Sequence, residues 1–222
     1  KHWATPAYVK PYKEQNELNR IDFGNFNKLD TETLNCLLSL LEKNLQNQDI
    51  VIISQQIAGS LFVDEFIEKL LILINKFCDT LFIVDSRHNS DDFPSAILKL
   101  NDFTAESMVD NTTPKGAGVT RENVIKTAKT LYKKLKNTIF ITRGINGCIL
   151  VDEGVIKEIP SIKITGKIDT VGAGDSMLAG ICIGLVSGQD AYNSACLGTL
   201  AAAVSIQKLY QTGTVSPEEL LM

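Results

Sequence analysis

The sequence has little of what metal clusters and disulfide scaffolds require. Its 222 residues include only two histidines and five cysteines, and no two cysteines form a C-x-x-C pair or stand beside a histidine. This pattern argues against both a zinc ribbon and a disulfide framework. We therefore expect reduced cysteines in the core, a prediction that covers Cys36, Cys78, Cys148, Cys182 and Cys196.

Concentrated positive charge and long apolar runs are also absent. The net charge is −4 and no dense Lys/Arg block occurs, so we expect no nucleic-acid partner. No stretch is as long as a membrane span, and the opening KHWATPAYVK lacks the apolar core of a signal peptide. With 44% hydrophobic residues, the composition is that of an ordinary globular protein, which we expect in the cytoplasm and not in a membrane.

The order of the expected elements indicates an α/β fold. Short β-branched runs alternate with amphipathic stretches whose apolar residues have helical spacing, and this alternation is typical of a parallel sheet covered on both faces. We expect strands over 49–54, 80–85 and 138–142, and helices over 61–77 and 121–136.

The ends of the chain depart from this alternation. Residues 143–159 contain Asn-Gly and Glu-Gly turns between apolar runs, which predicts added antiparallel strands. Two apolar stretches, 175–188 and 190–209, predict largely buried helices. Near the start, residues 7–23 alternate apolar and polar positions around a polar centre, as a hairpin or a pair of edge strands does.

The stretch DTVGAGDS, residues 169–176, is the clearest candidate site. A glycine-rich turn at the start of a helix exposes unpaired backbone N–H groups, which bind anions. Gly172 and Gly174 would let this backbone wrap closely around an oxygen anion. The structural alternative is that Asp175 only caps the helix while the glycines only turn the chain.

Two common glycine-rich sites do not fit this stretch. A P-loop has Lys and then Ser or Thr after its last glycine, and neither is present. The dinucleotide fingerprint fails because Met177 occupies its third glycine position. An anion site with a carboxylate beside it does suit phosphoryl transfer, in which Asp175 would accept the proton of an attacking hydroxyl.

Three ordered stretches resemble the PfkB, or ribokinase-like, family of carbohydrate kinases. DTVGAGDSMLAG matches every fixed position of the family signature Asp-Thr-x-Gly-Ala-Gly-Asp. ITRGINGCIL is similar to the nucleotide-binding strand–turn–strand, and AAAVSIQKLYQTGTVSPEEL to the closing adenine-side helix and tail. Within the family, YVKPYKEQNELNRIDF and VIISQQIAGSL are similar to segments of the heptose-phosphate kinases of ADP-heptose synthesis.

This resemblance implies a ribokinase-like fold and an ATP-dependent kinase of a sugar or sugar phosphate. It implies that Asp175 is the catalytic base and that Gly172, Ala173 and Gly174 form the anion hole. It further implies ATP-binding roles for Asn101, Thr142, Gly144, Gly147, Asp169 and Thr170. For the two glycines at 144 and 147, a plain hairpin with an Asn-Gly turn is the alternative interpretation.

The metal site is where the sequence departs from the family. LKLNDFTAES resembles the Asn-x-x-Glu motif that helps to place Mg²⁺, but Thr104 stands three residues after Asn101. The nearest carboxylate, Glu106, matches a second acid of the heptose kinases, and the resemblance assigns it to Mg²⁺, directly or through water. Some relatives also bind a monovalent cation near the signature loop.

Arg87 follows the strand at 80–85, where open α/β sheets bind their ligands. We expect it either to contact a phosphate or the substrate, or to pair in solvent with Asp91 or Asp92.

Relatives begin with a segment that carries a Gly-Gly sugar-binding motif, and this chain starts after it. We therefore expect residues 1–222 to be one kinase domain without its N-terminal portion, with 5–24 as a lid or edge-strand hairpin. Relatives often pair through such strands, so the hairpin could form a homodimer, and the alternative is that it packs on its own domain. A nucleotide-binding protein without kinase activity is the alternative function.

Overall fold

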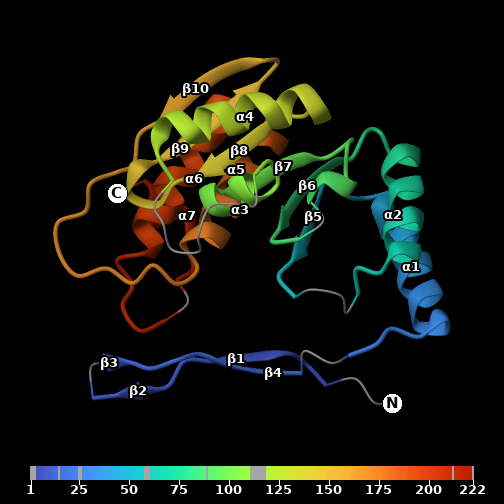
Figure 1. The fold of residues 1–222 in the computed structure, drawn as a ribbon, viewed down its shortest axis with the longest axis horizontal. Coiled ribbons are helices and arrows are strands. Elements are labelled where there is room, and N and C mark those ends of the chain that lie inside the picture. Colours follow the sequence, from blue (N-terminus) through green and yellow to red (C-terminus); the bar gives the residue numbers. More distant parts are fainter. Residues whose placement is uncertain are drawn as a thin grey trace.

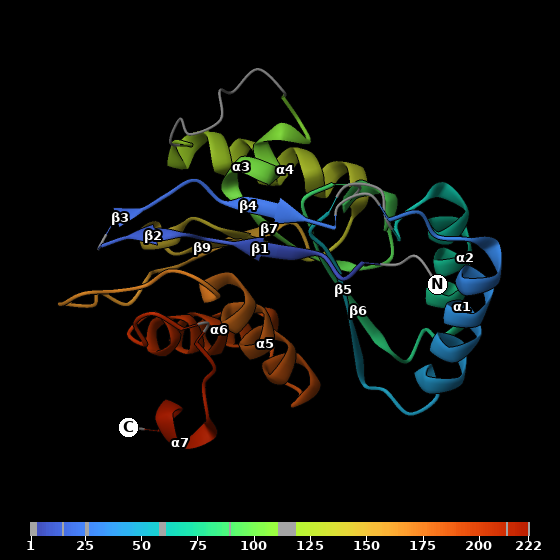
Figure 2. The same ribbon diagram turned by 90° about the horizontal axis from the view of Figure 1, so that it is seen from below.

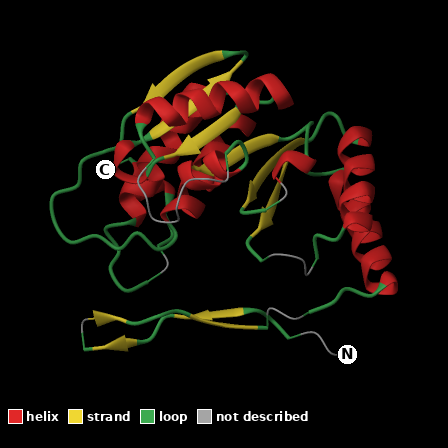
Figure 3. Ribbon diagram, in the orientation of Figure 1, coloured by secondary structure: helices red, strands yellow, loops and turns green. Residues whose placement is uncertain are grey.

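The computed structural model has the α/β architecture expected from the sequence (Figures 1 and 3). A six-stranded sheet forms its centre, with helices on both faces, and a separate N-terminal hairpin lies beside it (Figure 1). The structure describes residues 4–14, 16–24, 27–57, 61–88, 90–110, 119–211 and 213–221.

The central sheet is mostly parallel. Its strands lie in the order β10-β9-β8-β7-β6-β5, so neighbours in the sheet are also neighbours along the chain. Strands β5 to β8 run parallel to one another, whereas β9 runs antiparallel to both β8 and β10, as expected from the turns at 143–159. The strands are β5 (Ile50–Gln55), β6 (Leu81–Ser86), β7 (Ile97–Asn101), β8 (Ile139–Thr142), β9 (Cys148–Asp152) and β10 (Val155–Ile159).

Two helical layers cover the two faces of the sheet. Alternate strand residues point to opposite faces, so Phe82 and Val84 join one apolar core while Ile83 joins the other. The first core is covered by α1 (Thr31–Leu45), α2 (Asp64–Lys76) and α4 (Arg121–Leu135). The second is covered by α5 (Ala173–Val186) and α6 (Ala191–Ser205), which lie opposite α4 in Figure 2.

Local sequence signals set where the helices begin. The side chains of Asp30, Thr120 and Asp190 each accept a hydrogen bond from the third N–H of the helix that follows. Short elements complete the fold, namely α3 (Asp102–Ser107), α7 (Pro217–Leu220) and the 3₁₀ turns Ser90–Asp92 and Gly144–Asn146.

Helices α5 and α6 pack unusually close together because glycines face each other. A Cβ atom placed on Gly180 would lie 2.7 Å from the Cα of Gly198, and one placed on Gly184 would lie 2.7 Å from Ser194. Any larger residue at these positions would push the helices apart. This contact fixes α5, and with it the loop that precedes α5.

The N-terminal hairpin predicted within 5–24 is present. Strand β1 (Ala7–Val9) pairs antiparallel with β4 (Ile21–Phe23), and β2 (Tyr12–Lys13) pairs with β3 (Asn16–Glu17). The hairpin forms no part of the central sheet, and Figure 2 shows it crossing in front of the body. Its Tyr8 hydroxyl donates a hydrogen bond of 3.5 Å to the carbonyl oxygen of Gln56, which lies just after β5.

The prediction that all five cysteines lie in the core is wrong for two of them. Cys148 and Cys182 are buried and Cys196 is partly buried, but Cys36 and Cys78 are exposed. Cys36 lies on the solvent side of α1, whose core face is formed by Leu34 and Leu38, and Cys78 lies in the turn after α2. Among the described residues all five are free thiols. No helix in the described ranges has the length and apolar character needed to cross a membrane.

Candidate active site

The glycine-rich loop leads directly into the N-terminus of α5, which has no side-chain cap. Gly172 is the N-cap residue, with φ of +79°, a left-handed conformation that favours glycine. Asp175 lies inside the first turn and is exposed, so it is not the N-cap. The N–H of Ala173 donates to the carbonyl of Thr170 at 3.2 Å, while those of Gly174 and Asp175 remain available to an anion, next to a carboxylate.

Asp169 fixes the start of this loop through three hydrogen bonds. Its carboxylate accepts hydrogen bonds from the backbone N–H groups of Val171 (3.0 Å) and Tyr210 (3.3 Å). Its own N–H donates to the carbonyl of Ile206 at 2.8 Å. Asp169 thus joins the loop to the segment after α6, and it lines neither of the two cavities described below.

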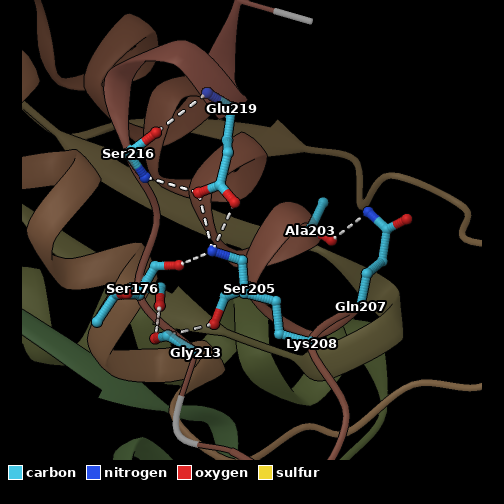
Figure 4. Close-up of polar contacts among 9 residues, drawn as sticks. Ser176, Ala203, Ser205, Gln207, Lys208, Gly213, Ser216 and Glu219 are labelled. Carbon is cyan, nitrogen blue, oxygen red and sulfur yellow. Dashed lines mark hydrogen bonds and ion pairs between the residues drawn. The ribbon is translucent and has the colours of Figure 1, made fainter.

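The same C-terminal segment also forms hydrogen bonds with α5 and α6 (Figure 4). The hydroxyls of Ser176 on α5 and Ser205 on α6 both donate to the carbonyl of Gly213, at 3.4 and 3.3 Å. Further along, Lys208 forms an ion pair of 2.7 Å with Glu219, whose carboxylate also accepts from the N–H of Ser216. Ser176, the residue after Asp175, is therefore hydrogen-bonded to the C-terminal segment.

A polar cavity of about 240 Å³ opens in front of the loop. It lies at the carboxyl ends of β6, β7 and β8, where ligands bind in open α/β sheets. Six residues expected from the sequence line it, namely Gly172, Gly174, Asp175, Asn101, Thr142 and Arg87. Five others line it too, namely Gln56, Asp85, Ser86, Lys99 and Thr104.

A larger, mainly apolar cavity of about 690 Å³ adjoins the polar one, since Thr142 and Gly174 line both. Four further residues expected to bind ATP or form the anion hole line it, namely Gly144, Gly147, Thr170 and Ala173. Its walls come from α5, α6 and the segment around 162–168, through Met177, Ala202, Ala203, Ile162, Ile164 and Ile168. The two cavities together suit a ligand with an apolar body and an anionic end.

The two glycines of the β8–β9 connection differ in what they do. Gly147 has φ of +79°, and a Cβ there would lie 2.1 Å from the carbonyl oxygen of Ile159, so this turn excludes any side chain. Gly144 has φ of +54°, and a Cβ there would meet nothing within 4 Å. The hairpin interpretation of Gly147 therefore has a definite structural basis beside its place in the apolar cavity.

A buried ion pair in the polar cavity was not anticipated. The ammonium nitrogen of Lys99 on β7 lies 2.6 Å from the Asp85 carboxylate on β6, and their side chains are 6% and 14% exposed. The sequence does contain a signal, because Lys99 is a charge within the otherwise apolar strand ILKLN. Lysine is rarely buried without a partner or a function.

The residues expected to place Mg²⁺ do not lie together. Asn101 lines the polar cavity, and its side-chain oxygen accepts from the N–H of Thr104 at 2.6 Å, which caps α3. Glu106 lines neither cavity; it is buried and faces α4, where Asn123 donates to it at 3.4 Å. Its second carboxylate oxygen is buried and has no hydrogen-bond partner among the residues that the structure describes. The carboxylates that line the polar cavity are those of Asp85 and Asp175.

Arg87 lies at the mouth of the polar cavity. Its N–H donates to the carbonyl of Gln55 at 3.0 Å, while its side chain is exposed. Asp91, one of its two anticipated partners, is paired with Lys134 on α4 at 2.7 Å. This placement favours contact with an anionic ligand over the surface pairing with Asp91.

Comparison with known proteins identifies the family and confirms the fold. The pfkB family of carbohydrate kinases matches residues 10–218. The bifunctional protein HldE of Hydrogenovibrio crunogenus is 26% identical over 223 residues, which cover 98% of this chain and 43% of that protein. The chain thus spans less than half the length of this curated relative. A second HldE, from Campylobacter fetus, is 30% identical over 82% of this chain and 40% of its own length.

Among solved structures, ribokinase from Thermotoga maritima superposes with a TM-score of 0.73 at 20% identity. That alignment covers 97% of this chain and 68% of the ribokinase chain. At this level of identity the likeness concerns the fold, which is ribokinase-like.

Proposed function

The chain belongs to the pfkB family of carbohydrate kinases, and from this we propose that it transfers the γ-phosphoryl group of ATP to a hydroxyl of a sugar or sugar phosphate. One observation supports the proposal above others. The exposed carboxylate of Asp175 stands at the uncapped N-terminus of α5, inside a polar cavity that continues into an apolar one. A carboxylate in the first turn stabilises the helix, but beside a bound phosphate it also repels that anion, and a role as the base for the acceptor hydroxyl accounts for its place there.

The two cavities suggest how ATP would lie. Its base and ribose would occupy the apolar cavity between α6 and the segment around 162–168, where apolar side chains line the walls. Its phosphates would extend past Thr142 toward Gly172 and Gly174, because the N–H groups there favour negative charge.

In the proposed reaction Asp175 removes the proton from the acceptor hydroxyl. The hydroxyl oxygen then bonds to the γ-phosphorus, while the bond between that phosphorus and the oxygen bridging the β- and γ-phosphates breaks, so that ADP leaves with the bonding electrons. Negative charge rises on the oxygens around phosphorus during transfer. The N–H groups at the start of α5 would stabilise that charge without having to reorient.

Mg²⁺ would arrive with the nucleotide and would neutralise charge on its phosphates. Mg²⁺ prefers oxygen ligands and keeps several waters. The polar cavity offers it the side-chain oxygen of Asn101, since Asp85 pairs with Lys99 and Asp175 is assigned to the acceptor hydroxyl. Because Glu106 faces α4, we do not assign it as a direct ligand.

The acceptor that we favour is a sugar phosphate of the heptose class. The resemblance of residues 8–23 and 51–61 to heptose-phosphate kinases supports this choice, as does the match to HldE proteins along most of the chain. Arg87 at the mouth of the polar cavity is suited to contact the phosphate of such an acceptor.

One observation favours a second function, nucleotide binding without transfer. Thr104 replaces the acid of the family motif, and the neighbouring Glu106 does not line the cavity. If Mg²⁺ placement depends on that acid, ATP would bind and would not react.

The test compares Asp175→Asn with Asp64→Asn in assays of ATP-dependent transfer to a panel of sugar phosphates. Asp64 is a matched control because it is also an exposed acid in the first turn of a helix, α2, and lines neither cavity. We expect the Asp175 variant to lose at least about 1000-fold in kcat and to retain ATP affinity, because the base acts on the acceptor. We expect the Asp64 variant to keep its activity.

Binding of ATP by all three proteins without turnover of any acceptor would favour the second function. Failure of the unaltered protein to bind ATP would refute both.

A further inference from the structure

Lys99 occupies a position that packing alone does not explain. Its neighbours Leu98 and Leu100 point into the core under α4, so Lys99 points to the opposite face, toward α5. There it is 6% exposed and pairs with Asp85. Removing two charges from water costs nearly as much as their attraction returns, so a buried pair contributes little net stability. An apolar pair of the same size would serve the core as well.

The ammonium group of Lys99 lies directly against the proposed anion hole. A Cβ atom built on Gly174 would be 3.2 Å from the Lys99 ammonium nitrogen. Lys99, Gly172 and Asp175 line the same polar cavity. An anion bound at the N-terminus of α5 would therefore also be within reach of this cation.

A cation at this position would balance negative charge in the cavity. Its lining includes two carboxylates, Asp85 and Asp175, and a nucleotide would add several negative charges. Among the described residues, the other cationic side chain in the lining is that of Arg87, which is exposed at the mouth. Coulombic interactions are stronger in partly buried sites than in water, so a fixed ammonium here would strongly favour phosphate.

We propose that Lys99 contacts the phosphate oxygens of the bound nucleotide and stabilises the charge that develops during transfer. Asp85 is its positioning residue: it holds the ammonium against the sheet and balances its charge when no phosphate is present. This inference rests on the proposed function, since it specifies how the nucleotide is held at the same site.

The test measures affinity for ATP and for adenosine in Lys99→Met, Lys99→Arg and the control Lys134→Met. Lys134 also pairs with an aspartate, but on the surface of α4 and away from both cavities. We expect Lys99→Met to bind ATP about 10- to 100-fold more weakly, which is the usual effect of losing one charge-assisted hydrogen bond. Its affinity for adenosine should change less than about twofold, because adenosine has no phosphate.

Lys99→Arg should recover part of the ATP affinity, since it restores the positive charge, and Lys134→Met should match the unaltered protein. Equal loss of ATP and adenosine affinity in Lys99→Met would mean that the residue only maintains the fold. Unchanged ATP affinity would overturn the inference outright.

Lys99→Met leaves Asp85 buried and unpaired, which can unfold a protein. The double variant Lys99→Met/Asp85→Asn removes both charges and should retain the melting temperature within a few degrees. It must show the same selective loss of ATP affinity, or the inference fails.

The two proposals fail separately. If the unaltered protein binds ATP and phosphorylates no sugar, the kinase proposal falls, while a selective loss of ATP affinity in Lys99→Met still supports the phosphate contact. If the protein phosphorylates a sugar phosphate and Lys99→Met does so equally well, only the inference about Lys99 falls.

Discussion

At position 147 the backbone leaves no room for a side chain. An alanine there would hold its Cβ 2.1 Å from the Ile159 carbonyl oxygen, in a backbone conformation that side chains rarely adopt. At position 144 an alanine would meet only the conformational cost, because the space around it is open.

We expect Gly144→Ala to lower the free energy of unfolding by about 1 kcal/mol and Gly147→Ala by clearly more, roughly 3 kcal/mol or above. Urea denaturation of both variants, followed by circular dichroism, measures the difference. Equal losses would mean that β10 moves aside at no cost, contrary to the packing described.

The thiols should fall into two reactivity classes. Burial raises the pKa of the Cys148 thiol to about 12 and that of Cys182 to about 11, whereas Cys36 and Cys78 are exposed. Iodoacetamide at pH 8 should therefore modify Cys36 and Cys78 within minutes and leave Cys148 and Cys182 unmodified in the folded protein. Peptide mass spectrometry gives the order, and early modification of Cys148 would contradict the burial described.

The same shift makes stability depend on pH at the alkaline end. The folded-state pKa of Cys148 is raised above its ordinary value of 9.0, so the unfolded chain loses this proton first as the pH rises. The free energy of unfolding should therefore be unaffected by this thiol below about pH 8 and should fall as the pH rises from 9 toward 12. Cys148→Ala, measured by urea denaturation across this range, should show a weaker decline than the unaltered protein.

At the level of single residues, the sequence predicted a site from neighbouring residues of one motif, but it did not predict an ion pair between residues of two different strands. Gly172, Gly174 and Asp175 are contiguous in a recognisable signature, and they line one cavity. Lys99 and Asp85 come from two strands, 14 positions apart, and their pairing depends on the parallel register of β6 beside β7. No local pattern encodes that register.

At the level of elements, the contact between α5 and α6 determines where the anion site lies. Alanine favours a helix over glycine by about 1 kcal/mol, so Gly180→Ala would stabilise an isolated α5. In the protein its Cβ would lie 2.7 Å from Gly198, and overpacking of this kind costs about 1–3 kcal/mol.

We therefore expect Gly180→Ala to lower the melting temperature by several degrees. It should also lower kcat for transfer, because α5 carries Asp175 and must shift away from α6. Ile183→Ala is the control: this residue is on the same helix but is 56% exposed, so both measurements should change little. A higher melting temperature for Gly180→Ala would show that the helices separate freely.

Most elements could be predicted because their patterns are local. The strands over 50–55, 81–86 and 139–142 and the helices over 64–76 and 121–135 lie within a few residues of their expected bounds. Helix α1 was not anticipated, although Asp30 and the apolar spacing after it are ordinary helix signals. Strand β7 was also missed, because it has five residues and a lysine at its centre.

At the level of the whole molecule, the N-terminal hairpin is the part least attached to the rest. Six of its large apolar side chains are between 41% and 53% exposed, namely Tyr8, Val9, Tyr12, Leu18, Ile21 and Phe23. It forms no ladder with the central sheet, and yet Tyr8 reaches Gln56, which lines the polar cavity. Through this contact the hairpin lies beside the polar cavity. We propose that it covers the acceptor sugar there.

This arrangement predicts how limited proteolysis divides the protein. Trypsin should cut first within 5–24, at sites such as Lys13, which is exposed and ends the two-residue strand β2. The sheet and its two helical layers hold their own cores, so circular dichroism and ATP affinity should persist after this cut. Phosphoryl transfer should fall sharply, because the acceptor would lose its cover while the nucleotide cavities stay intact. Loss of ATP affinity together with transfer would mean that the hairpin holds the nucleotide rather than the sugar, and persistence of both would mean that it is not a lid.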